Sequence, residues 1–212
     1  MPDSQFDKSK HTFRDDSFLE VLKNAIELFH LTPAYPLPPN ESFRGAGVYA
    51  LYYKGHNPLY EKFSQINKFE LTLPIYVGKA VPAGWRQSRI SEGATRAGSE
   101  LFNRIREHSR NIIKSNNLNV KDFYCRFMIF EATGSDMIST VEAALIKLHK
   151  PLWNTIVDGF GNHTPGTGRF AQAKSDWDVI HPGREWAEKC TGRHSEPAYV
   201  EERIKQYFLE LN

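Results

Sequence analysis

The chain has 212 residues, a length that suits one globular domain with insertions. Its 40% hydrophobic, 13% aromatic and 25% charged residues exclude a disordered chain, and its formal net charge of +2 is too small to identify a nucleic-acid partner by itself. The two distant cysteines, Cys125 and Cys190, exclude a zinc finger or a disulfide scaffold and favour a reducing compartment.

The N-terminal sequence MPDSQFDKSK has no apolar core of the kind that signal peptides carry. No run in the chain approaches the roughly 18 apolar residues that a membrane-spanning helix needs. We therefore expect a cytoplasmic protein that has no membrane partner.

The first element in chain order is an amphipathic helix over FLEVLKNAIELFH, residues 18–30, with Asp15, Asp16 and Ser17 as candidate N-caps. Its apolar stripe at helical spacing consists of Phe18, Leu22, Ile26 and Phe29. The next stretch, LTPAYPLPPNESFRG, has four prolines within seven residues, which excludes a helix or an inner strand. We interpret residues 1–44 as an N-terminal helix and a proline-rich linker.

Two short strands follow, GVYALYY at residues 47–53 and PIYVGK at residues 74–79, separated by a long polar stretch. A segment rich in Gly, Ala, Ser and Arg then leads to a helix from about residue 99 to 114. Residues 121–131 have the aromatic and β-branched content of a third strand. Ser135 is expected to cap a further helix that Pro151 ends, and the C-terminal part closes with a helix over residues 198–211. The fold class is therefore α+β.

Positive charge is concentrated in one segment of this near-neutral chain. From Lys79 to Lys114 there are eight Lys or Arg residues and three Glu, whereas the first 47 residues carry five basic and seven acidic residues. This distribution is typical of a local anion-binding face, although a solvated helix surface has the same pattern.

Four residues on or just beyond the expected helices are candidates for a chemical role, although a solvated basic face would also account for the first two. Arg104 and His108 are four residues apart, so they lie on one face of their helix at the edge of its apolar stripe. Glu142 lies beside the apolar stripe of the next helix, where a carboxylate needs an arginine, a hydrogen-bond network or a metal ion as partner. Asn154 follows a tryptophan just beyond that helix, where a turn residue is also common.

The ordered set Gly47-Val48-Tyr49, Tyr76-Val77-Gly78, Arg104, His108, Glu142 and Asn154 resembles the GIY-YIG nuclease superfamily. The short chain and the Arg-x-x-x-His spacing resemble its type II restriction endonucleases in particular. The resemblance covers residues 45–156 and implies a catalytic core with a small three-stranded antiparallel sheet flanked by helices. Residues 157–212 are then an irregular extension with a C-terminal helix.

The sequence departs from the common family pattern in two ways. Val48 and Val77 replace isoleucines, which is a conservative change. Tyr49 and Tyr76 are 27 residues apart, further than in many members. The extra loop is either a decoration or an insertion that contacts DNA.

The resemblance implies a role for each matched residue. Glu142 would hold one divalent cation per site, Mg²⁺ with Mn²⁺ as a substitute, because Mg²⁺ prefers carboxylate and water ligands. Arg104 would bind the scissile phosphate. Either Tyr49 or His108 would accept the proton of the attacking water. Tyr76 would orient water or phosphate and Asn154 would fix the site by hydrogen bonds, while Lys79 is either a phosphate-backbone contact or an exposed residue at a strand end.

A restriction enzyme must cut both strands of double-stranded DNA, so we expect a homodimer whose two-fold axis matches a palindromic site. The restriction enzymes of this family that the chain most resembles cut CCGCGG, and the resemblance alone implies a GC-rich target. A cognate DNA methyltransferase is expected in the cell but not as a stable complex. Candidate DNA-binding residues besides Lys79 are Arg86, Arg89, Arg96, Arg169 and Lys174.

Three alternative functions are compatible with parts of the sequence. A GIY-YIG repair or homing endonuclease would nick or cut as a monomer, but it usually carries a separate DNA-binding module. A catalytically silent DNA-binding protein would have no use for Glu142 beside the core. The GNH triplet at residues 161–163, together with His181, is similar to a His-Asn-His metal site, but the surrounding sequence lacks the strand–turn–helix context.

Overall fold

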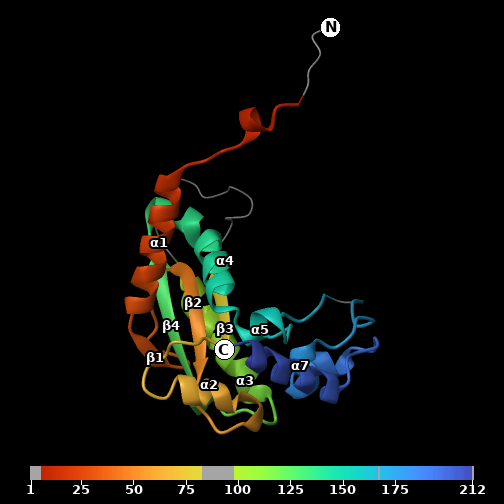
Figure 1. The fold of residues 1–212 in the computed structure, drawn as a ribbon. Helices are drawn as coiled ribbons and strands as arrows, with labels where there is room; N and C mark the ends of the chain where they lie inside the picture. The colour runs from red at the N-terminus through yellow and green to blue at the C-terminus, as the bar shows by residue number, and fades with distance from the viewer. Residues whose placement is uncertain (1–5, 83–97, 167, 212) are drawn as a thin grey trace.

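A four-stranded antiparallel sheet forms the centre of the molecule (Figure 1). A computed structural model describes residues 6–82, 98–166 and 168–211. The strand order is β1-β4-β2-β3, where the strands are β1 (Ala34–Pro36), β2 (Ala46–Tyr53), β3 (Tyr76–Ala80) and β4 (Phe123–Phe130). The predicted α+β class is confirmed, with one strand more than the three expected.

The additional strand, β1, comes from the proline-rich segment. Ala34, Tyr35 and Pro36 pair with Arg126, Cys125 and Tyr124 of β4, and β1 forms an edge of the sheet. An edge strand tolerates proline because the missing N–H can face away from the ladder. The proline density thus excluded an inner strand correctly, but it also concealed a short outer one.

The helices flank this sheet on both faces. They are α1 (Asp16–Leu31), α2 (Glu61–Ile66), α3 (Glu100–Lys114), α4 (Ile138–His149), α5 (Leu152–Thr155), α6 (Asp176–Ile180) and α7 (Pro197–Glu210). Short 3-10 turns lie at Lys8–His11, Pro58–Tyr60, Val120–Asp122, Ala132–Met137 and Ala187–Lys189. Within the described ranges, no helix has the length and apolar character needed to cross a membrane.

The ends of α1 and α4 can be compared with the capping residues predicted from the sequence. Asp15 caps α1 as expected, because its carboxylate accepts a hydrogen bond from the Ser17 amide at 2.9 Å. The helix expected to follow a Ser135 cap begins at Ile138 instead, because a 3-10 turn occupies the preceding residues. Lys150 ends α4 in a left-handed conformation with φ of 45°, directly before Pro151.

The two faces of β2 belong to different hydrophobic clusters. Val48, Ala50 and Tyr52 pack against α4 and against Phe29 of α1, while Tyr49, Leu51 and Tyr53 pack toward α3. Figure 1 shows α1 and α4 together along one face of the sheet. The N-terminal helix therefore packs on its own domain, and any role in dimer formation stays a prediction.

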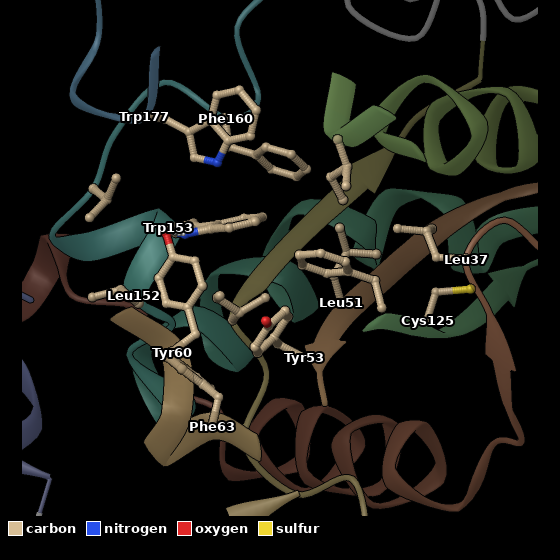
Figure 2. Close-up of a cluster of buried hydrophobic side chains, with 14 of the residues drawn as sticks. Leu37, Leu51, Tyr53, Tyr60, Phe63, Cys125, Leu152, Trp153, Phe160 and Trp177 are labelled. Carbon is tan, nitrogen blue, oxygen red and sulfur yellow. Dashed lines mark hydrogen bonds between the residues drawn. The ribbon is translucent and has the colours of Figure 1, made fainter. Parts of the chain in front are cut away.

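The polar stretch between β2 and β3 contributes to the core. Tyr60 and Phe63 are fully buried, and they contact residues from the C-terminal part of the chain. Figure 2 shows the ring of Trp153 between Tyr60 on one side and Phe160 and Trp177 on the other. The long insertion is thus partly a structural element that supports α5.

The sequence-based division at residue 156 stays a prediction. Phe160 and Trp177, which lie beyond that boundary, are fully buried in the same cluster as Tyr49 and Ile105. Burying two such large aromatic side chains stabilises the contact by several kcal/mol, on the scale of roughly 25 cal/mol per Å² of apolar surface. The C-terminal residues therefore pack as part of the core.

A pair of histidines joins the last turns of α1 and α4. The Nε2 atoms of His30 and His149 are 2.9 Å apart. Burial, assisted by the neighbouring His30, lowers the pKa of His149 to about 4. Burial and the charge of Arg126 lower the pKa of His30. Both imidazoles are therefore neutral where they pack between the helices.

This histidine pair predicts a specific loss of stability in acid. An unfolded histidine has a pKa near ~6.5, so between that pH and about 4 the unfolded chain binds more protons than the folded chain at His149. The free energy of unfolding should therefore fall as the pH is lowered through this window. In His149→Gln, which keeps a polar group facing His30, that fall should be smaller by on the order of 1 kcal/mol.

Urea denaturation of both proteins at several pH values measures this difference. His56→Gln, at an exposed position in the loop after β2, is the matched control and should behave as wild type. Equal pH dependence in wild type and His149→Gln would contradict the assignment.

Candidate active site

The two tyrosine motifs lie on adjacent antiparallel strands. Tyr49 of β2 is opposite Gly78 of β3, and Tyr76 is opposite Leu51. The ring centroids of Tyr49 and Tyr76 are 6.2 Å apart. Both phenols therefore lie on the face of the sheet that α3 covers.

The glycines of the two motifs are required by close contacts. A Cβ atom on Gly78 would lie 2.4 Å from the Tyr49 hydroxyl, so the tyrosine ring crosses the space where a side chain would be. A Cβ atom on Gly47 would lie 2.0 Å from the Met128 carbonyl oxygen of β4. Glycine at these positions lets the strands and the Tyr49 ring approach one another.

Tyr49 is hydrogen-bonded to His108 from α3. Its hydroxyl oxygen is 2.5 Å from His108 Nε2, and both residues are fully buried. The imidazole stacks on Phe160, with ring centroids 4.5 Å apart and an interplanar angle of 20°. His108 Nδ1 has no hydrogen-bond partner among the residues that the structure describes. Within the described ranges, the hydrogen bond of this imidazole is thus the one to the Tyr49 hydroxyl.

Burial determines the protonation of this pair. It raises the pKa of Tyr49 well above its usual value, an effect that the nearby Arg104 guanidinium only partly offsets. Burial and the charge of Arg104 hold the pKa of His108 well below its usual value. The phenol and the imidazole are therefore both neutral at physiological pH, and a proton can move along their hydrogen bond only if another charge stabilises the products.

Arg104 lies one turn before His108 and extends along the same helix face. Its guanidinium donates to the Gly161 carbonyl at 2.7 Å, to Glu107 at 2.7 Å and to His163 Nε2 at 3.0 Å. Its side chain is 17% exposed. Partners from two segments, α3 and the loop after α5, hold this guanidinium at the site.

Glu142 of α4 is ion-paired with a lysine, whereas the sequence led us to expect an arginine, a hydrogen-bond network or a metal ion. The Lys79 ammonium is 2.6 Å from Glu142 Oε2, and the two side chains are 32% and 19% exposed. Lys79 is therefore neither deep in the core nor free in solvent. A cleft of about 840 Å³ has Tyr49, Tyr76, Lys79, Arg104, Glu142 and His163 among its lining residues.

Asn154 lies behind this cleft and secures its wall. Its side-chain amide donates to the Val77 carbonyl at 2.8 Å and accepts from the Val77 amide at 2.8 Å. The neighbouring Trp153 amide donates to the Ile75 carbonyl at 2.9 Å. Because β3 is an edge strand, these contacts satisfy backbone groups that a further strand would otherwise bind.

The predicted DNA-binding residues other than Lys79 either lie outside the described residues or lie away from the cleft. Arg86, Arg89 and Arg96 lie outside the described residues. Lys174 is ion-paired with Glu188 at 2.6 Å, and Arg169 is exposed in the loop before it. Neither lines the cleft, and their roles stay predictions.

The His-Asn-His alternative receives no support from the geometry. His163 contacts Arg104 and Glu107 at the cleft, whereas His181 is fully buried against Tyr60 and Asn117. Within residues 6–82, 98–166 and 168–211, no three His, Cys, Asp or Glu side chains form a group suited to a metal ion.

Sequence reasoning missed three contributors to the site. Phe160 and Gly161 belong to the segment interpreted as an irregular extension, and no short-range pattern marks a carbonyl or a ring as an active-site partner. Glu107 was recognisable, because it follows Arg104 by three residues and such pairs meet on a helix.

The Asn154 clamp predicts a paired effect on stability. Asn154→Ala leaves both polar groups of Val77 without partners, so the free energy of unfolding should fall by ~1–3 kcal/mol. Asn154→Asp keeps the acceptor and loses the donor, so its loss should be intermediate. Urea denaturation measures both, with Asn24→Ala on the exposed side of α1 as the control. A loss below about 0.5 kcal/mol in Asn154→Ala would show that the clamp contributes little.

Comparison with known protein families matches residues 41–208, which are 168 of the 212 residues, to the family described as the Eco29kI GIY-YIG domain. That family is one of type II restriction endonucleases, and Eco29kI recognises CCGCGG. A search of curated proteins found no match. The family match confirms the resemblance inferred from the two tyrosine motifs. The chain therefore belongs to the Eco29kI GIY-YIG family and is a DNA-cleaving nuclease.

Proposed function

We propose that this nuclease is a type II restriction endonuclease that hydrolyses double-stranded DNA at a palindromic, GC-rich site. The observation that carries the proposal is the cleft in which the buried Tyr49–His108 pair, Arg104 and the Lys79–Glu142 pair meet. Phosphodiester hydrolysis needs a proton acceptor, neutralisation of the phosphate and stabilisation of the leaving oxygen. These side chains supply one candidate for each task.

Tyr49 is the first proton acceptor in this proposal, and His108 is the second. Both residues are fully buried, but Tyr49 lines the cleft and His108 does not, so the phenol is the group of this pair that lies next to water in the cleft. The phenol oxygen takes a proton from the attacking water while its own proton moves to His108 Nε2. Because both groups start neutral, the negative phosphate nearby supplies the charge that favours the imidazolium.

Arg104 binds the scissile phosphate in this scheme. Its guanidinium faces the same cleft as Tyr49, and a planar fork of donors matches two oxygens of a phosphoryl group. The contact to the Gly161 carbonyl fixes its orientation before DNA arrives. Tyr76, which also lines the cleft, orients the water or the phosphate.

The donor set fits one divalent cation. Glu142 is a single carboxylate at the cleft wall, and Mg²⁺ commonly binds through one or two carboxylates together with water and substrate phosphate. When bound, Mg²⁺ or Mn²⁺ would stabilise negative charge on the leaving oxygen. Lys79 now neutralises Glu142, and it would become available to the DNA backbone once that carboxylate has another partner.

One cleft of this kind cuts one strand, so cutting both strands of a palindrome calls for two copies of the chain. We propose a homodimer with its two-fold axis on the DNA dyad. A cognate methyltransferase in the same cell would protect the host DNA without forming a stable complex with this protein.

Purified protein incubated with unmethylated plasmid and bacteriophage DNA, with Mg²⁺ or with EDTA, tests the proposal. We expect discrete fragments that need Mg²⁺, with ends that map to one palindrome. Nicked circles without linear products would support a repair or homing nuclease instead. Binding without cleavage on several DNAs would point to a catalytically silent protein.

Glu142→Gln should separate binding from cleavage. The amide cannot replace the carboxylate as a cation ligand, and it leaves the Lys79 charge free for DNA. We expect DNA binding in EDTA to be retained and cleavage to be lost. Glu202→Gln, which removes the carboxylate partner of Lys205 on α7, is the matched control and should cut normally. Full activity of Glu142→Gln would end the metal assignment.

Arg104→Ala should reduce the cleavage rate by at least ~10²-fold, the usual scale for the loss of one group that stabilises charge in the transition state. Arg104→Lys should recover only part of that loss, because an ammonium lacks the planar fork. Single-turnover assays on a short duplex measure both, with exposed Lys205→Ala on α7 as the control. A change below about threefold in Arg104→Ala would place this residue outside the reaction.

A further inference from the structure

Glu107 holds the arginine that is proposed to bind phosphate. One carboxylate oxygen, Oε2, accepts from Arg104 at 2.7 Å, while the other, Oε1, is 2.9 Å from His163 Nδ1. His163 Nε2 in turn contacts the Arg104 guanidinium at 3.0 Å. The three side chains thus form a closed triangle at the wall of the cleft.

The carboxylate occupies a position suited to a substrate oxygen. Arginine binds carboxylate and phosphate oxygens through the same fork of N–H donors. Glu107 therefore neutralises the charge that a DNA phosphate would meet, and its own charge repels that phosphate. Arg104 is only 17% exposed, and Glu107 lines the same cleft, so a phosphate that binds the guanidinium there also comes close to this carboxylate.

Three features let Glu107 leave Arg104 without disturbing the rest of the site. Glu107 is 34% exposed, so its carboxylate can turn toward solvent. His163 is 67% exposed on the loop after α5, and it already holds one of the carboxylate oxygens. The Gly161 carbonyl keeps the guanidinium in place from the other side.

We propose that Glu107 is an internal competitor of the scissile phosphate for Arg104, and that His163 is the alternative partner that retains Glu107 when DNA is bound. This inference rests on the proposed function, because it takes Arg104 as the phosphate ligand. Its consequence is that the enzyme binds phosphate weakly until the DNA is seated well enough to displace the carboxylate. Glu107 and His163 are positioning residues and do not take part in the chemical step.

The first test is binding of a random-sequence duplex in EDTA, measured by fluorescence anisotropy at several salt concentrations. Glu107→Gln keeps an acceptor for Arg104 but removes the charge, so binding should tighten by about 5- to 10-fold. Because Arg104 then gains a phosphate contact, the salt dependence of log K should steepen by about one. Glu202→Gln, which removes an exposed carboxylate on α7, should bind as wild type does.

Double variants identify Arg104 as the origin of the gain. Adding Arg104→Ala to Glu107→Gln should abolish the tighter binding, since no guanidinium remains to be released. His163→Ala should weaken binding two- to threefold by leaving Glu107 with Arg104 alone, yet it should have no effect in the Glu107→Gln background. Such non-additivity is expected only for residues that act through one another.

The outcomes separate the inference from the proposed function. If wild type binds and cuts DNA while Glu107→Gln, with an unchanged melting temperature, binds no more tightly, the competitor role is wrong. A gain that persists after Arg104→Ala would also overturn it, because general electrostatics would then be the cause. If neither wild type nor Glu107→Gln binds any duplex, the proposed function itself fails.

Discussion

The hydrogen bond between Tyr49 and His108 is the interaction on which the rest of the site depends. Two neutral polar groups are buried here against one another, at a cost that is tolerable only while the bond is kept. The surrounding structure removes the alternatives: Gly78 makes room for the Tyr49 ring, and Phe160 covers the imidazole. The pair is thereby held in one position in the wall of the cleft. Of the two residues, only Tyr49 lines the cleft.

This constraint explains why the C-terminal segment is integral to the site. Phe160 and Gly161 contact His108 and Arg104, yet they lie beyond the last matched motif residue, Asn154. They are brought back by the aromatic cluster around Trp153, which also receives Tyr60 from the long loop between the two tyrosine strands. The insertion and the extension therefore support the same short helix, α5, and through Asn154 they secure the edge strand that carries Tyr76.

The parts of the site that could be predicted from the sequence are those that follow from the spacing of residues within one helix. Arg104 and His108 could be placed on one helix face because four residues make one turn, and Glu142 could be given a partner because a lone carboxylate beside an apolar stripe is costly. The sequence did not show that Lys79 is that partner, because Lys79 of β3 and Glu142 of α4 are 63 residues apart in the chain. The strand β1 and the Gly161 carbonyl were missed for a related reason: an edge strand and a backbone acceptor leave little trace in residue type.

The charges of the cleft give the last step of the synthesis. In the DNA-free protein, two of the cations that line the cleft have carboxylate partners, Lys79 with Glu142 and Arg104 with Glu107. Paired in this way, Lys79 and Arg104 attract DNA only weakly, so under the proposed function initial binding depends on other groups. Under the proposed function, a divalent cation would replace Lys79 as the partner of Glu142, and a phosphate would replace Glu107 as the partner of Arg104. The positive charges of Lys79 and Arg104 would then become available to DNA only when the metal ion and the phosphate are both bound. Hydrolysis requires this arrangement, because the charge must be stabilised where it develops on the phosphate.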